Sequence, residues 1–274
     1  MVILTRTVRF CINPPQPGVD PASPVSGSNG YASIPAMRGL GRHYELDVRC
    51  RGMADPLTGY FINIKEIDAA VRQHALGIIA AACARADAGD TSVRESAVLA
   101  SVLTAVNTGL ANRVASILWR LSPFYSVEMH MNQPAVAVLR QRFEIAAAHR
   151  LHIPSLSADE NRRIFGKCNN PSGHGHNYVI EPAVAVPASA QIPFTLADLE
   201  HAVNDAIIKP FDHTHLNIDT PEFADGRGVN PSVENISRAF FELLAPRIAS
   251  ANAGAVLQHV TVWETEKTSS TYPG

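Results

Sequence analysis

A run of twelve residues from Lys167 to Tyr178 sets the strongest limit on how the second half of the chain can fold. It carries Cys168 and, six and eight residues later, His174 and His176. If Gly175 to Ala185 form a β-strand, its period of two places both histidines on one face. Two imidazoles on one face are half of a metal site, and the glycines beside them leave room for a ligand. Taken alone, the same pattern also fits a polar strand face.

A third histidine is available from the preceding segment. Residues Phe143 to Leu151 are interpreted as the end of the strand before the histidine run. Antiparallel pairing with the next strand would bring His149 beside His174 and His176. Three neutral histidines with an open fourth position form the usual catalytic zinc site, so the sequence predicts a Zn²⁺ centre.

The composition is that of a globular protein with room for two compact domains. The 274 residues are 46% hydrophobic and 18% charged. No apolar run approaches the roughly 20 residues that span a bilayer, and the N-terminus lacks the apolar region of a signal peptide. We therefore expect a cytoplasmic protein without a membrane partner. The four cysteines are scattered without a CxxC pattern, which favours reduced thiols: Cys11, Cys50, Cys83 and Cys168.

The distribution of charge restricts the partners. The net charge is −2, and no basic stripe of the kind that binds nucleic acid is present, so no nucleic-acid partner is expected. Eight of the eleven histidines follow residue 135, which places the chemistry in the second half. Four cations surround the histidine run in the sequence, and they are either solvated loop charges or the contacts of an anionic substrate: Arg150, Arg162, Arg163 and Lys167.

The first half resembles a degenerate copy of the second. Gly39 to Tyr44 aligns with Gly173 to Tyr178, and Leu40 and Arg42 occupy the positions of the two histidines. Because leucine and arginine are not zinc ligands, we expect no metal in the first half.

Two further alignments extend this comparison. The position that matches His149 falls near Gln16, and the alignment of 123–131 with 259–264 places Met131 opposite Glu264. The domain boundary is expected at Asn132 to Pro134, which gives a degenerate unit 1–133 and a catalytic unit 134–274.

Periodicity and capping residues predict an α+β fold with antiparallel sheets and two helices on one face of each. Helix 63–86 is expected to begin at an Asn63 cap, and a helix from Thr195 to about Lys209 is expected to end at Pro210. The same patterns predict these further elements: helices 92–119 and 232–249, a loop or short helix 155–165, and strands 44–51, 123–131, 136–148, 177–186 and 257–265.

Five motifs in the second half, in this order, resemble those of the 6-pyruvoyl-tetrahydropterin synthase family: Ala148 to Leu151, Cys168 to Tyr178, Phe211 to Asn217, Pro231 to Asn235 and Val262 to Thr265. The resemblance implies the tunnel fold. In this fold several units join edge to edge into a closed β-barrel, with helices outside and active sites between units. Two tandem units per chain then imply a homo-oligomer, either a trimer or a dimer of trimers.

The resemblance also implies a reaction and a role for each candidate residue. The family converts 7,8-dihydroneopterin triphosphate, a pterin, to 6-pyruvoyl-tetrahydropterin with loss of triphosphate. In tetrahydrobiopterin biosynthesis this is a zinc-dependent lyase step. The implied metal ligands are His149, His174 and His176, the implied catalytic residues are Cys168, Asp212 and His213, and the implied substrate contacts are Glu264, Ser232 and Glu234.

Simpler interpretations of these residues stay open. Cys168 also fits a small buried side chain without a catalytic role. Asp212 and His213 also fit a polar turn that follows a helix. Glu264 is otherwise a carboxylate at a strand end, and Glu234 a first-turn carboxylate that the helix dipole favours.

Two other functions remain. One is the related 6-carboxy-tetrahydropterin synthase of deazapurine (queuosine) biosynthesis, although the five residues between Cys168 and His174 resemble the pyruvoyl-forming type. The other is a pterin- or zinc-binding protein without catalytic activity.

Overall fold

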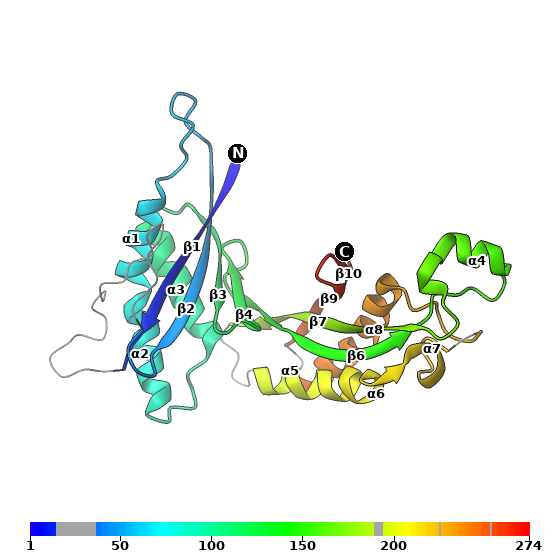
Figure 1. The fold of residues 1–274 in the computed structure, drawn as a ribbon. Helices are drawn as coiled ribbons and strands as arrows, with labels where there is room; N and C mark the ends of the chain where they lie inside the picture. The colour runs from blue at the N-terminus through cyan, green and yellow to red at the C-terminus, as the bar shows by residue number, and fades with distance from the viewer. Residues whose placement is uncertain (15–36, 189–193, 225, 253) are drawn as a thin grey trace. The chain divides into compact units, whose positions relative to one another are not determined.

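The computed structural model describes residues 1–14, 37–188, 194–224, 226–252 and 254–274 (Figure 1). The chain divides into two compact units. Unit 1 comprises Met1–Leu139 with Pro187–Gln191, and unit 2 comprises Arg140–Val186 with Ile192–Gly274. Both contain a β-sheet and helices, which confirms the α+β class. Among the described residues, none of the helices is long and apolar enough to cross a bilayer.

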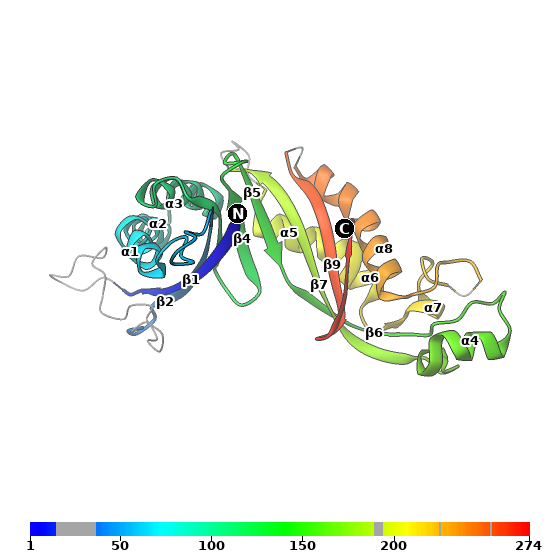
Figure 2. The same cartoon turned by 90° about the horizontal axis from the view of Figure 1, so that it is seen from above.

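Unit 1 is built on four antiparallel strands, paired in the order β1, β2, β3 and β4. Val8 and Phe10 of β1 and Leu46 and Val48 of β2 are buried, and Trp119 of β3 lies opposite Leu46 on the same face. This face packs against the helices (Figure 2). The strands are β1 Val2–Ile12, β2 Arg42–Gly52, β3 Val114–Arg120 and β4 Tyr125–His130, and the helices are α1 Ile64–His74, α2 Leu76–Asp87 and α3 Glu95–Gly109.

The helical region of unit 1 differs from the prediction in two places. Asn63 caps α1 as expected, but the predicted helix 63–86 is interrupted at Ala75, which separates α1 from α2. The predicted helix 92–119 ends at Gly109, and the positive φ angles of Ala111 and Asn112 turn the chain out of the helical conformation. The following residues form β3, because Ile117 and Trp119 belong to the strand face that covers the helices.

This change also corrects the internal alignment between the two halves. Val179 pairs with Trp263 in unit 2, whereas Glu45, the residue after Tyr44, pairs with Arg120 in unit 1. Tyr44 aligns with Tyr178, so Glu45 corresponds to Val179, and their partners Arg120 and Trp263 correspond to each other. The residue after Arg120 is therefore the counterpart of Glu264. That residue is Leu121, and the alignment of Met131 with Glu264 was wrong. The conclusion that the first half lacks this carboxylate is unchanged.

Unit 2 contains a sheet in which β6 and β7 pair antiparallel, as do β7 with β9 and β9 with β10. A short strand, β8, adds in parallel to the other side of β6. The strands are β6 Phe143–His149, β7 His174–Pro187, β8 Thr214–His215, β9 Val256–Thr265 and β10 Thr268–Tyr272, while β5 Val136–Gln141 spans the boundary between the units in sequence.

The helical segments of unit 2 follow their capping residues. Thr195 forms a capping box with Asp198, and the side chain of Ser232 accepts a hydrogen bond at the start of α8. The segments are α4 Ala158–Phe165, the 3₁₀ turn η1 Gly166–Asn169, α5 Leu196–Val203, the π-helical turn η2 Asn204–Ile208, α6 Lys209–Phe211, α7 Leu216–Asp219 and α8 Val233–Ala251.

Three boundaries in unit 2 differ from the sequence prediction. The strand 136–148 is divided at Arg142 into β5 and β6. The helix from Thr195 continues one residue beyond Pro210, and the π-helical turn η2 precedes the proline. The predicted last strand, β9, is followed by β10 after the two-residue turn at Glu266 and Lys267.

Replacing Phe240 of α8 by alanine is expected to lower the free energy of unfolding by about 3–5 kcal/mol. The side chain is fully buried, and its ring centroid lies 5.0 Å from that of Phe211. The matched control is Phe124→Ala, since Phe124 is 56% exposed and its truncation leaves no cavity. Urea unfolding of both variants measures the difference, and equal losses would contradict this account of the unit 2 core.

Candidate functional site

The pairing of β6 with β7 brings three histidines together. His149 lies directly opposite His174, and Ala147 lies opposite His176. Paired residues of an antiparallel sheet share a face, and His176 follows two residues after His174, so all three imidazoles lie on the same face. The antiparallel pairing expected from the sequence is therefore present in the structure.

The three histidines and Glu264 form one compact cluster, which we call the His₃Glu cluster. One ligand atom from each residue lies within 4.8 Å of all the others. The Nε2 atoms of His149 and His174 are 3.0 Å apart, and Glu264 Oε1 is 3.3 Å from His149 Nε2 and 3.5 Å from His176 Nε2. It is the one group of three or more metal-ligating side chains found among the described residues.

The surroundings of His149 prepare it to bind a cation. Its Nδ1 lies 2.7 Å from the carbonyl oxygen of Pro231, so a proton on Nδ1 is donated to that carbonyl. Nε2 is then unprotonated and faces the cluster. Burial lowers the pKa of His149 to about 4, and the hydrogen bond to Pro231 opposes this effect. Burial is also the main cause that lowers the pKa of His174. Both imidazoles are consequently neutral, as a metal ligand must be, at neutral pH.

Buried polar atoms without partners support the assignment of this cluster as a metal site. His176 Nε2 and His174 Nδ1 are buried and have no hydrogen-bond partner within the described structure. Unpaired buried nitrogens are costly, and a bound cation removes this cost for a nitrogen that ligates it. Three imidazoles and a carboxylate form a donor set that suits zinc, so the residues fit the ion that the sequence predicts.

The structure adds two findings about Glu264 and Tyr178 that the sequence did not predict. The sequence placed Glu264 in contact with the substrate, whereas the structure also places it among the possible metal ligands. Tyr178 continues the alternation of His174 and His176 along β7, and its hydroxyl is buried without a partner in the described structure. The period of two could have identified Tyr178. Nothing in the sequence indicated the carbonyl of Pro231.

Cys168 lies in η1 and is joined to the segment that follows β6. Burial raises the pKa of Tyr178, and the nearby carboxylate of Glu264 raises it further. The thiol is half-buried in η1, and the Cys168 carbonyl accepts a hydrogen bond of 2.9 Å from the amide of Leu151. This bond fixes η1 to the segment that follows β6.

Asp212 and His213 form a second group with its own supports. Asp212 Oδ1 accepts a hydrogen bond of 2.8 Å from the amide of Ala146, and Oδ2 lies 2.8 Å from His213 Nδ1. His213 has a positive φ angle of 58°, and its amide donates to the carbonyl of Ala146. Its ring is 82% exposed. The carboxylate thus orients an imidazole that is available to solvent or to a ligand.

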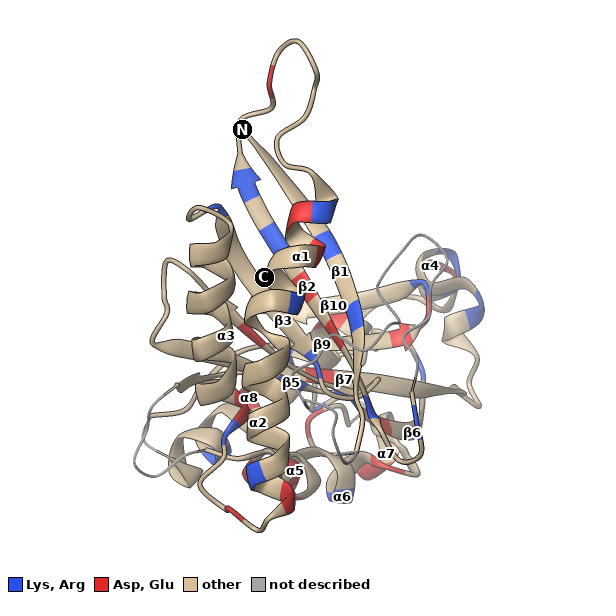
Figure 3. Ribbon diagram, turned by 90° about the vertical axis from the view of Figure 1, so that its left-hand side faces the viewer, with Lys and Arg blue, Asp and Glu red and all other residues tan. Residues whose placement is uncertain are grey.

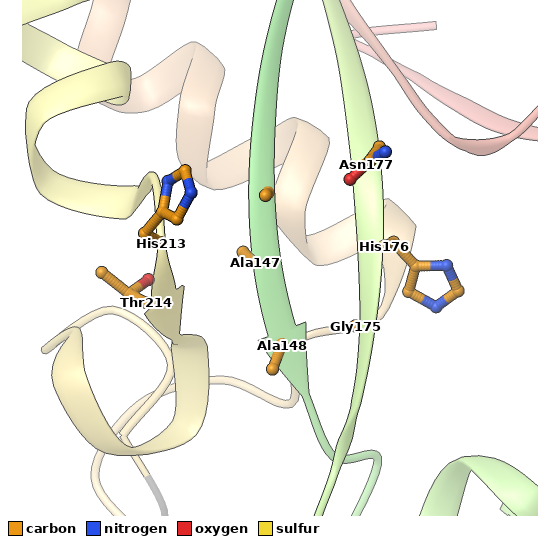
Figure 4. Close-up of a pocket in the computed structure, with 8 residues that line it drawn as sticks. Ala147, Ala148, Gly175, His176, Asn177, His213 and Thr214 are labelled. Atoms are coloured by element: carbon orange, nitrogen blue, oxygen red, sulfur yellow. The ribbon is translucent and has the colours of Figure 1, made fainter.

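The Asp212–His213 pair is separated from the His₃Glu cluster by the sheet. His213 and Thr214 line an open pocket of about 430 Å³ beside β6. In Figure 4 the His213 ring lies beside β6, and the His176 ring points away from it on the far side of β7. The His213 and His176 rings therefore lie on opposite sides of the β6–β7 pair within one chain. His176 also lines this pocket, together with Ala146, Ala147, Ala148, Gly175 and Asn177.

Ser232 and Glu234 stand at the start of α8. Ser232 caps the helix by accepting a hydrogen bond from the amide of Asn235, and Glu234 is exposed in the first turn. Neither residue belongs to the His₃Glu cluster or lines the His213 pocket. The residue before Ser232, Pro231, contacts the cluster, because its carbonyl oxygen lies 2.7 Å from His149 Nδ1.

In the first half, the matching positions carry different chemistry. Gly39 and Gly173 both have positive φ angles, which supports the alignment of the two glycine runs. Leu40 is 95% exposed, and Arg42 forms an ion pair with Asp87. Gln16, the predicted counterpart of His149, lies outside the described residues. The absence of a metal from this half stays a prediction.

Replacing Asp212 by asparagine is expected to lower stability by about 1 kcal/mol near neutral pH, the usual contribution of such hydrogen bonds. The amide of Ala146 and then His213 hold the pKa of Asp212 below its usual value. A lowered folded-state pKa stabilises the protein above the unfolded pKa of about 3.9, and this contribution is lost as the pH falls through the folded value. Thermal unfolding of both proteins should therefore show a difference that shrinks below about pH 4. A difference independent of pH would contradict the role of the charge.

Comparisons with known proteins agree on the second half of the chain. A family model described as 6-pyruvoyl tetrahydropterin synthase matches residues 138–274. The 6-pyruvoyl tetrahydrobiopterin synthase of Homo sapiens is 38% identical over 141 residues, which cover 50% of this chain and 92% of the human protein. The Drosophila melanogaster protein of the same description is 36% identical over 147 residues, which cover 53% of this chain and 83% of that protein.

The structure of Caenorhabditis elegans 6-pyruvoyl tetrahydropterin synthase has a TM-score of 0.46 and 33% sequence identity. The alignment covers 51% of this chain and 96% of that chain.

Proposed function

Because the chain belongs to the 6-pyruvoyl tetrahydropterin synthase family through residues 138–274, we propose that it is a zinc-dependent lyase. It converts 7,8-dihydroneopterin triphosphate to 6-pyruvoyl-tetrahydropterin with loss of triphosphate. The observation that carries this proposal is the His₃Glu cluster, which lies wholly within the matched half. Composition and fold would not distinguish an enzyme from a binding protein, whereas this cluster supplies the donors of a catalytic metal.

His149, His174 and His176 would hold the zinc ion, and Glu264 is within reach of the same position. When bound, zinc acts as a Lewis acid that polarises oxygens of the substrate side chain. The residues of the chain keep this position available: Pro231 fixes the orientation of the His149 ring, and the sheet register fixes the spacing of the other two.

Cys168 is the proposed general base that removes a proton from a carbon of the substrate side chain. It is half-buried in η1, which a hydrogen bond joins to Leu151, two residues after His149. The thiolate is the reactive form of cysteine, and a nearby cation favours it. The Tyr178 hydroxyl, buried without a partner in the described structure, is suited to donate a hydrogen bond to the substrate there.

Asp212 and His213 are proposed as the second acid–base unit. The carboxylate fixes the imidazole tautomer. Since the His213 ring lies beside β6 and the His176 ring points away on the far side of β7, the pair would serve the cluster of a neighbouring subunit. The proposal therefore includes a homo-oligomer in which tunnel-fold units close into a barrel, with 1–133 as a degenerate unit and 134–274 as the catalytic unit.

Glu264 has two possible partners, and one substitution separates them. As a pterin anchor it would accept two parallel hydrogen bonds from the amino-pyrimidinone edge of the substrate. If anchoring is its main role, Glu264→Gln should retain zinc and raise KM by about tenfold or more. Zinc content and steady-state kinetics measure the two effects. Loss of zinc from the folded variant would instead assign Glu264 to the metal.

The experiment that tests the proposed function is a product analysis with the purified, zinc-loaded protein. Incubation with 7,8-dihydroneopterin triphosphate should yield 6-pyruvoyl-tetrahydropterin and one triphosphate per turnover. Formation of 6-carboxy-tetrahydropterin alone would overturn the proposed product and leave the site assignment in place. Retention of zinc and pterin without turnover would identify a binding protein.

A further inference from the structure

We propose that the basic lobe, defined as Arg162 and Arg163 of α4, Lys167 of η1 and the neighbouring Arg150, binds the triphosphate group of the substrate. This inference rests on the proposed function, since that function supplies the triphosphate. It assigns a binding site to residues outside the His₃Glu cluster and outside the Asp212–His213 pair.

The charges of the lobe are separated along α4. At its start, the carboxylate of Glu160 is held by the amide and hydroxyl of Ser157, at 2.9 and 2.7 Å. At its end, Arg162, Arg163 and Lys167 are exposed. Within the described part of the chain, no carboxylate lies within ion-pair distance of these three cations or of Arg150, which contrasts with the many paired arginines of unit 1. Lys and Arg segments on α4 are visible in Figure 3.

The lobe is held in place by a buried side chain. Asn161 is fully buried, and its amide nitrogen donates to the carbonyl oxygens of Ile153, Leu156 and Ser157 at 2.9–3.1 Å. Its oxygen accepts from the amide of Ile153 at 2.8 Å. A positive φ angle of 53° at Gly166 then turns the chain from α4 into η1. The cations therefore project from an anchored segment, which lowers the entropy that anion binding would cost.

Hydrogen bonds tie the lobe to the end of β6, where His149 lies. Asn169 Nδ2 donates to the carbonyl of Leu151 at 2.7 Å, and Arg150 Nε donates to the carbonyl of Asn169 at 3.2 Å. Arg150 directly follows His149, and Lys167 directly precedes Cys168. The cations thus flank both the proposed metal ligand and the proposed base.

Several neighbouring cations without carboxylate partners, as in the basic lobe, suit a polyphosphate better than a single carboxylate. Arginine binds phosphate oxygens through two parallel hydrogen bonds, and a triphosphate offers several anionic oxygens to more than one cation. The triphosphate is also the group that the reaction expels, so its contacts act both on substrate binding and on the departure of this group. Their loss should lower kcat/KM.

The test compares two double variants of the full-length protein with the same change in charge. Arg162→Gln/Arg163→Gln removes two cations of the lobe. Arg238→Gln/Arg247→Gln removes two exposed arginines of α8 and is the matched control. The readouts are KM and kcat for 7,8-dihydroneopterin triphosphate, and the inhibition constant and calorimetric affinity of inorganic triphosphate.

We expect the lobe variant to lower kcat/KM and to raise the inhibition constant of inorganic triphosphate, each by roughly tenfold or more. The control variant should match wild type, and added salt should weaken inhibition of the wild type. Unchanged constants in the lobe variant, or equal changes in both variants, would overturn the inference. If the wild type forms no pterin product but binds inorganic triphosphate through Arg162 and Arg163, the proposed function fails while the anion site stands.

Discussion

Replacing His174 and His176 together by alanine is expected to reduce the zinc content of the purified protein from about one ion per chain to nearly none. The two side chains supply two of the three imidazoles, and the remaining His149 and Glu264 cannot complete a four-coordinate site. Protonation of His149 should release little zinc near neutral pH, because burial lowers the pKa of this histidine to about 4. Elemental analysis per folded chain measures the effect.

The matched control replaces the corresponding positions of the first half, Leu40 and Arg42, by alanine. Leu40 is exposed and Arg42 pairs with Asp87, so this variant should keep its zinc. Circular dichroism establishes that both variants are folded before the metal is counted. About two ions per chain in the wild type would show that the first half binds metal, and none would remove the Lewis acid on which the proposed lyase depends.

The histidine cluster was predictable because it depends on local pattern. A period of two fixes the faces of His174 and His176, and antiparallel pairing of adjacent strands supplies His149. Helix starts were predictable at Asn63, Thr195 and Ser232 for the same reason, since each side chain accepts a hydrogen bond from an amide of the first turn.

What the sequence did not predict depends on contacts between distant segments. The end of α3 at Gly109 was not separated from β3, because the residues on both sides of the short Asn- and Gly-containing turn are mostly apolar. Likewise, the presence of Glu264 among the metal-ligating atoms follows from the register between β7 and β9. A one-residue change of that register would move the carboxylate to the other face of the sheet.

Mixing two inactive variants should restore activity if the acid–base pair serves a neighbouring subunit. Cys168→Ala and His213→Gln are each expected to reduce turnover by about 10²–10⁴-fold, the usual contribution of a general acid or base. Random mixing in equal amounts should leave about a quarter of the shared sites intact and restore about a quarter of the wild-type turnover.

The physical basis for this restoration is the arrangement across β6 and β7. Cys168 is joined through its carbonyl to Leu151, two residues after His149, whereas the His213 ring lies beside β6 and the His176 ring points away from it. The informative control mixes Cys168→Ala with His174→Ala/His176→Ala. Both variants damage the same side of every subunit, so no intact site can form. If the first mixture forms mixed oligomers and stays as inactive as this control, the complete site must lie within one chain, and the Asp212–His213 pair then has no access to the metal-bound substrate.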